Sequence, residues 1–147
     1  MTLLYADTSA LARAYLADEP DHEQLRDLLL EGHDPVVTSA LARIELASAI
    51  RAAAGAGRLR RWQSLLERID ADCEEQGPLT LLALQPELVL EPAYDLVRRH
   101  RLRTLDAIHL AVALEDCPKL AEDGDVAFVT RDGHQAAAAR TLGLAVR

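Results

Sequence analysis

The chain has 147 residues, of which 50% are hydrophobic and only 3% aromatic, so it has the size of one domain with a mainly aliphatic core. Its 16 basic and 24 acidic residues give a formal net charge of −8, which excludes loose binding to nucleic acid or anionic membranes through the overall charge. We therefore expect a single domain, residues 1–147, that does not bind DNA by itself.

The sequence carries no signal for a membrane, for secretion or for a cysteine-based metal site. No stretch reaches about 18 consecutive apolar residues, the length that a membrane span needs. The segment 1–9 lacks the basic and apolar regions of a secretory signal. Cys73 and Cys117 are far apart and belong to no Cys/His cluster, so neither a zinc site nor a disulfide framework is predicted. We expect a cytoplasmic protein whose two thiols are buried or unreactive in a reducing compartment.

Short apolar runs alternate with amphipathic helical stretches, which is typical of a parallel sheet covered by helices on both faces. The segment Asp7-Thr8-Ser9, Ser39 and Thr104 are good candidates to cap the helices that follow them. In chain order the pattern predicts strand 3–6, helix 9–17, helix 21–31, strand 35–38, helix 39–54, helix 59–69, strand 79–84, helix 86–101, helix 104–116, strand 126–130, a helix after a turn at 132–133, and a short strand 144–146. The predicted fold is a three-layer α/β/α sandwich with a short, mainly parallel central sheet.

Two aspartates stand just after predicted strands. Asp7 directly follows the first strand, and Asp132 comes two residues after the fourth, before Gly133. Ligands of open parallel sheets bind beyond the carboxyl ends of the strands, so both positions are candidate functional sites. Each also has a purely structural explanation, Asp7 as a helix cap and Asp132 as a turn residue.

Two further acids interrupt apolar helical stretches. Glu45 is flanked by apolar residues, and Asp106 shares a nearly all-apolar helix only with His109. A helix that is apolar almost all round is buried, and a buried carboxylate is costly unless it is paired or bound to a metal. The structural alternatives are a pairing of Glu45 with Arg43 or Arg51, and helix-start hydrogen bonds for Asp106.

The predicted topology lets these carboxylates converge, because Asp7 and Asp132 follow strands while Glu45 and Asp106 lie early on helices. Like charges in one cleft repel each other, so a cation is expected among them. Oxygen ligands without cysteines select a hard ion, Mg²⁺ or alternatively Mn²⁺. Such an ion suits phosphate chemistry.

Four blocks of sequence carry a family resemblance. They are DTSAL at 7–11, SALARIEL at 39–46, RTLDAIHLA at 103–111 and FVTRD at 128–132. In this order they resemble the PIN domain and, more narrowly, the VapC toxins of bacterial toxin–antitoxin pairs. The most specific piece is LDAIHLA, and together the blocks span nearly the whole chain.

The resemblance implies a Mg²⁺-dependent endoribonuclease that hydrolyses RNA phosphodiester bonds. The acids that match the family's cluster are Asp7, Glu45, Asp106 and Asp132. For the fourth acid, Asp123 and Asp125 are alternatives to Asp132, because they lie just before the strand.

The expected roles differ among these residues. Asp7, Asp106 and Asp132 would bind one or two metal ions, and Glu45 would be a further ligand or orient the attacking water as general base. Thr130, with Ser9, is expected to support the acidic cluster. His109 follows Asp106 by three residues on the same helix face, either as a ligand or as a histidine at the edge of the core.

A local basic segment precedes the helix of Asp106. Arginines suit phosphate binding through their bidentate geometry, so these side chains are candidate RNA contacts. The alternative is a solvated helix face with cations at its C-terminal end. The candidates are Arg98, Arg99, Arg101 and Arg103.

The resemblance also implies protein partners, namely a homodimer and an inhibitory antitoxin of the VapB type. The main alternative function is a catalytically inactive PIN-like module that binds RNA or protein. A phosphotransfer domain of the receiver or dehalogenase type is disfavoured. The dehalogenase pattern needs an acid where Ser9 stands, and the receiver pattern needs a lysine near the last strand, where Lys119 is the only lysine.

Overall fold

Five parallel strands form one sheet through the middle of the molecule, in the order β3-β2-β1-β4-β5. The computed structural model describes residues 1–147. The strands are β1 (Thr2–Ala6), β2 (Val36–Ser39), β3 (Leu79–Leu82), β4 (Asp125–Val129) and β5 (Ala145–Val146). All the strand pairs are parallel, as expected for crossovers that contain helices.

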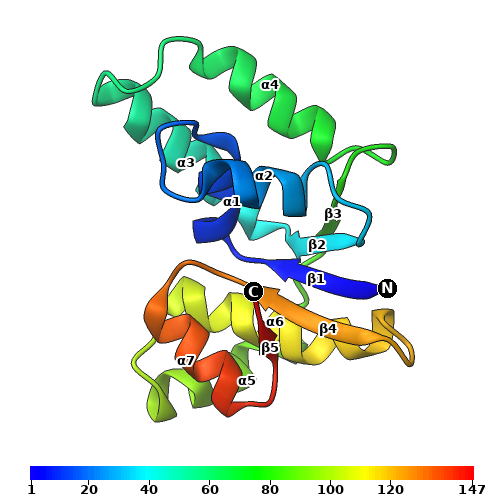
Figure 1. Ribbon diagram of the computed structural model, residues 1–147. Helices are drawn as coiled ribbons and strands as arrows, with labels where there is room; N and C mark the ends of the chain where they lie inside the picture. Colours follow the sequence, from blue (N-terminus) through cyan, green and yellow to red (C-terminus); the bar gives the residue numbers. More distant parts are fainter.

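Helices cover both faces of this sheet, as Figure 1 shows. One face carries α1 (Thr8–Tyr15), α2 (His22–Leu29), α3 (Leu41–Gly55) and α4 (Trp62–Asp72), and the other carries α5 (Pro86–Arg99), α6 (Thr104–Leu120) and α7 (Gly133–Thr141). The predicted three-layer α/β/α sandwich is therefore confirmed. None of these helices is long and apolar enough to cross a membrane.

Strand alternation divides the buried side chains into two cores. Leu4 and Ala6 of β1 pack with α1 to α4, whereas Leu3 and Tyr5 of the same strand pack with α5, α6 and α7. Helix α6 is the most deeply buried helix, with eight buried residues including His109. His109 is therefore a polar side chain inside an apolar layer, and it needs hydrogen-bond partners within that layer.

Several element boundaries differ from those expected. The third strand ends at Leu82, because Ser39 and Leu82 are the last pair between β2 and β3. Ser39 lies inside β2, although its Oγ still accepts a bond from the N–H of Leu41 at 3.2 Å. Thr104 is the first residue of α6 rather than its cap. This helix continues to Leu120, four residues beyond the expected end, and Cys117 in its last turn is buried.

Burial also decides the chemistry of the two thiols. Cys117 is fully buried in α6, and burial raises its pKa to about 12. Cys73 is only partly buried, but burial and the neighbouring Asp72 raise its pKa as well. Both groups therefore stay protonated at neutral pH, in which form a thiol is a poor nucleophile.

Candidate active site

The candidate site lies at the carboxyl ends of β1 and β4, where the strand order reverses. Strands β2 and β3 follow one another on one side of β1 in the sheet, whereas β4 and β5 lie on the other side of β1. The last pair between the two central strands joins Ala6 and Val129. Asp7 and Thr130, which follow them, therefore lie side by side at the topological switch point, the usual ligand position in such sheets.

Asp7 is held rigidly by three hydrogen-bond donors. Its Oδ1 accepts from the N–H of Ala10 at 2.9 Å and from Ser9 Oγ at 2.8 Å, and its Oδ2 accepts from Thr130 Oγ1 at 2.6 Å. The first of these bonds makes Asp7 the N-cap of α1. The side chain is only 2% exposed, and burial raises its pKa more than these donors lower it. Asp7 is thus the N-cap of α1 and also a carboxylate whose ionised form is disfavoured by burial.

Thr130 connects Asp7 to the other acids. Its Oγ1 accepts the N–H of Asp132 at 3.1 Å and lies 3.1 Å from Oε1 of Gln135. The amide nitrogen of Gln135 in turn donates to the backbone carbonyl of Asp106 at 3.0 Å. The buried side chains of Thr130 and Gln135 therefore connect the end of β4 to the first turn of α6.

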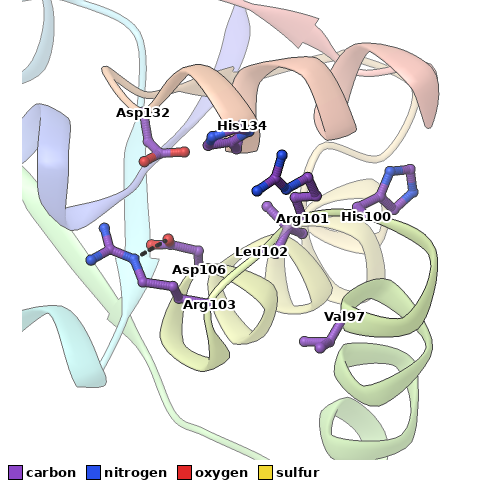
Figure 2. A pocket seen from close by; sticks show the side chains of 8 residues that line it. All are labelled: Val97, His100, Arg101, Leu102, Arg103, Asp106, Asp132 and His134. Atoms are coloured by element: carbon purple, nitrogen blue, oxygen red, sulfur yellow. Dashed lines mark ion pairs between the residues drawn. The ribbon is translucent and has the colours of Figure 1, made fainter.

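Asp106 and Asp132 face the same cleft of about 530 Å³ (Figure 2). Asp132 is the N-cap of α7 and uses Oδ1 to accept the N–H of Gln135 at 2.8 Å, whereas its Oδ2 makes no hydrogen bond within the protein. Burial, and then the neighbouring charge of Asp132, raises the pKa of Asp106. Its only close cation is the exposed Arg103, at 3.6 Å. The cleft therefore contains two carboxylates without a buried counter-charge.

Glu45 reaches the site from α3 through a histidine. Its Oε1 lies 2.6 Å from Nε2 of His109, while Nδ1 of the same ring lies 2.7 Å from the hydroxyl of Tyr5. The two partners considered from the sequence are engaged elsewhere. Arg43 pairs with Asp70 at 2.7 Å, and Arg51 stacks on Trp62. The fully buried His109 is thus the group that pairs with Glu45.

The alternative fourth acids lie at the other end of the sheet. Asp125 pairs with Thr2 at the first position of β4, so the whole strand separates it from Asp7. Asp123 precedes that strand and is exposed. Only Asp132 shares a cleft with Asp106.

The four arginine candidates divide into two pairs. Arg101 and Arg103 line the cleft, together with His100 and His134, and Figure 2 shows Arg103 beside Asp106. Arg98 lies over the ring of Tyr94 and near Asp95 instead. Arg99 is exposed at the end of α5 and does not line the cleft.

A divalent cation fits the donor chemistry of this cleft. No three acidic, histidine or cysteine side chains are close enough together to form a complete metal cage. Mg²⁺ does not need one, since it is usually bound by one or two carboxylates and retains waters or takes phosphate oxygens. Asp106 and Asp132 supply such a pair, and a cation between them would offset the repulsion that raises the pKa of Asp106.

Sequence reasoning missed three residues around this site. Gln135 is fully buried although it lies on a helix of alanines, and Tyr5 is one of only three tyrosines. His134 follows the turn at Asp132 and lines the cleft. Gln135 could have been identified as a polar residue in an alanine stretch. Tyr5 could have been identified as an aromatic residue in an otherwise aliphatic core.

Comparison with known proteins decides the family. The sequence profile of the PIN domain matches residues 4–141, nearly the whole chain. This chain belongs to the PIN domain family.

Curated relatives of this PIN domain place it in the VapC group. It is 33% identical to Ribonuclease VapC47 of Mycobacterium tuberculosis (strain CDC 1551 / Oshkosh), over 96% of this chain and 93% of the relative. It is 35% identical to Ribonuclease VapC46 of M. tuberculosis (strain ATCC 25618 / H37Rv), over 99% and 97% of the two chains. The VapC resemblance stated from the sequence blocks is confirmed.

A solved structure supports the fold of this PIN domain. The crystal structure of M. tuberculosis VapC20, a Sarcin-Ricin loop cleaving toxin, superposes with a TM-score of 0.64 and covers 92% of this chain and 94% of its own. The sequence identity is only 19%, so this similarity concerns the fold alone. It agrees with the parallel sheet and two helical layers of this PIN domain.

Proposed function

We propose that this chain is a Mg²⁺-dependent endoribonuclease toxin, hydrolysing RNA phosphodiester bonds and inhibited by a cognate antitoxin. Mn²⁺ is the alternative ion. The observation that carries the proposal is the cleft in which Asp106 and Asp132 face each other without a buried cation, beside Asp7 at the switch point of the sheet. The relatives named as ribonucleases support RNA as the substrate.

Each acid has a role that its surroundings support. Asp106 and Asp132 would hold the ion in the cleft, and Asp7 and Glu45 would act from beside it. When bound, the ion would activate water and offset negative charge on the phosphate. The protein fixes the donors: Ser9 and Thr130 orient Asp7, and Gln135 holds the backbone of Asp106 in place. A preorganised site of this kind avoids reorganisation during the reaction.

The acid–base step is assigned to Glu45. Its Oε1 is engaged by His109, whereas its Oε2 makes no hydrogen bond within the protein. The side chain is 21% exposed, so water has access to it. We propose that Glu45 orients the water that attacks the phosphate, which leaves a 5′-phosphate and a 3′-hydroxyl on the products.

The test uses the purified full chain and labelled RNA from a panel of structured RNAs and total bacterial RNA. Cleavage is expected in Mg²⁺ or Mn²⁺, loss of cleavage in excess EDTA, and recovery when the metal is restored. Cleavage that persists in EDTA would contradict metal dependence. Binding of RNA without cleavage in either metal would favour the inactive binding module.

The cleft also suggests where RNA phosphates bind. Replacing Arg101, which lines the cleft, by alanine is expected to raise KM for RNA about tenfold, equivalent to roughly 1.4 kcal/mol for one charged hydrogen bond. It should also reduce the slope of log affinity against log salt by about 1. Arg98→Ala is the matched control, because Arg98 lies over Tyr94 rather than in the cleft. Equal effects of both substitutions would contradict this placement.

Two exposed apolar grooves are available for the proposed partners, the antitoxin and a second copy of the chain. One lies between α3 and α4, where Ile44 is 69% exposed and borders Leu66. The other lies between α5 and α6 and is lined by Leu90 and Tyr94. Large exposed apolar side chains on adjacent helices are typical of interaction surfaces.

A further inference from the structure

The buried side chains behind Glu45 form a chain of hydrogen bonds that the proposed chemistry does not yet use. Tyr5 comes from β1, His109 from α6 and Glu45 from α3, at separations of 104 and 64 residues along the sequence. Tyr5 is fully buried and His109 is 1% exposed. Two buried polar groups from distant parts of the chain are thus joined at their hydrogen-bonding atoms.

The direction of these bonds follows from their donors. The oxygen of Tyr5 already accepts the N–H of Ser39 at 3.2 Å. A phenol has an ordinary pKa of about 10, so the hydroxyl of Tyr5 has a proton to donate at neutral pH. Its acceptor is Nδ1 of His109, at 2.7 Å. Because a carboxylate can only accept, the hydrogen of the 2.6 Å contact between Glu45 Oε1 and the ring lies on Nε2, which also has Thr8 Oγ1 at 3.2 Å.

Steric fixation adds to the hydrogen bonds. The ring of Tyr5 stacks on Phe128 with centroids 5.5 Å apart and planes 5° apart, and it meets the imidazole edge-on at 5.9 Å. Tyr5 and Phe128 belong to the same core, and His109 beside them is 1% exposed, so packing restricts the rotation of the rings. The packing and the contacts of both ring nitrogens consequently fix the orientation of the imidazole.

We propose that Tyr5 and His109 are positioning residues, which hold the carboxylate of Glu45 through Oε1 and leave Oε2 for water or substrate. The inference rests on the proposed function for its consequence in catalysis, but the hydrogen-bond chain is testable without it. Tyr5 fixes the tautomer of His109, and His109 fixes Glu45. A ring with the opposite tautomer would present a lone pair to the carboxylate and repel it.

The chain of hydrogen bonds is tested by ¹⁵N nuclear magnetic resonance of the imidazole of His109 in the metal-free protein. The wild type is expected to show protonated Nε2 and unprotonated Nδ1. Tyr5→Phe should shift these resonances towards a mixture of tautomers. A wild-type ring with hydrogen on Nδ1 would overturn the proposal, whether or not the protein cleaves RNA.

The effect on catalysis is tested by kinetics. Tyr5→Phe and His109→Phe are expected to lower kcat for RNA cleavage about 10- to 100-fold with little change in KM, as is typical when the groups that orient a site are removed. His109→Gln keeps an amide N–H for Glu45 and should retain more activity than His109→Phe. If His109→Phe does not fold, Tyr5→Phe carries the same test.

The matched control is Tyr15→Phe. Tyr15 is also a buried tyrosine and donates to Asp72 at 2.7 Å, but it packs in the opposite core. Its loss should lower stability without changing kcat. Equal kcat for Tyr5→Phe and the wild type would overturn the positioning role. A wild type that does not cleave RNA would instead refute the proposed function, and the resonance experiment would still decide the hydrogen-bond chain.

Discussion

Replacing Asp106 by asparagine is expected to reduce RNA cleavage by about 10²- to 10³-fold or more, the scale for removing a preorganised electrostatic group. The substitution preserves size and removes one of the two carboxylates that face the cleft. The fold should persist, because the backbone carbonyl of Asp106 keeps its bond from Gln135. The side chain loses only an exposed ion pair with Arg103. Cleavage rates and circular dichroism of the purified variant measure the two effects.

The control for this substitution is Asp125→Asn, which makes the same chemical change at the first residue of β4. Asp125 is exposed and pairs with Thr2 at the opposite end of the sheet, so cleavage should be unchanged. Asp132→Asn should behave like Asp106→Asn. If Asp125→Asn were inactive and Asp132→Asn active, the assignment of the fourth acid would be reversed.

Asp7→Asn is expected to abolish cleavage and at the same time to stabilise the metal-free protein. The hydrogen bonds can be kept, since the new amide oxygen accepts from Ala10 and its nitrogen can donate to Thr130. Thr130 can then turn its own proton to Gln135, 3.1 Å away. What is removed is the charge that burial disfavours. A gain of about 1 kcal/mol, or 2–4 °C in Tm, is typical of a stabilising single substitution.

The pH dependence of this gain identifies its cause. Because burial raises the pKa of Asp7, the folded protein binds this proton more tightly than the unfolded chain does. The contribution of Asp7 to stability is therefore lost as pH rises above the ordinary carboxyl pKa of about 3.9. The difference in unfolding free energy between Asp7→Asn and the wild type should grow from acidic to neutral pH in EDTA. A constant difference would indicate that lost or gained packing, rather than charge, is responsible.

Local patterns were sufficient to predict the layers and the main elements. The nearly all-apolar stretch of α6 predicted a buried helix, and it drew attention to Asp106 and His109 as its polar exceptions. The strand ends were less accurate, because a strand stops where its partner stops. Leu84 lies in an apolar run but is beyond the last pair of β2 and β3.

Long-range pairings could not be predicted in the same way. The partner of Glu45 lies 64 residues away on another helix, so neighbouring arginines were considered instead. The choice between Asp132 and Asp125 also depends on the direction of β4 beside β1, which places one at each end of the sheet. The family resemblance identified acidic residues near both ends of β4. The register of β4 beside β1 shows which of these acids lies at the same end of the sheet as Asp7.

The bond from Gln135 to the first turn of α6 has a consequence for the timing of activity during synthesis. Asp7 and Asp106 precede β4, but the side chains that hold them, Thr130 and Gln135, follow it. A growing chain that stops before β4 lacks one of the two strands that pair with β1, and it also lacks these two side chains. The same holds for a proteolytic fragment that ends there. We therefore expect a chain that ends before β4 to lack the ordered carboxylates of the candidate site, and to cleave no RNA until β4 and α7 have been added.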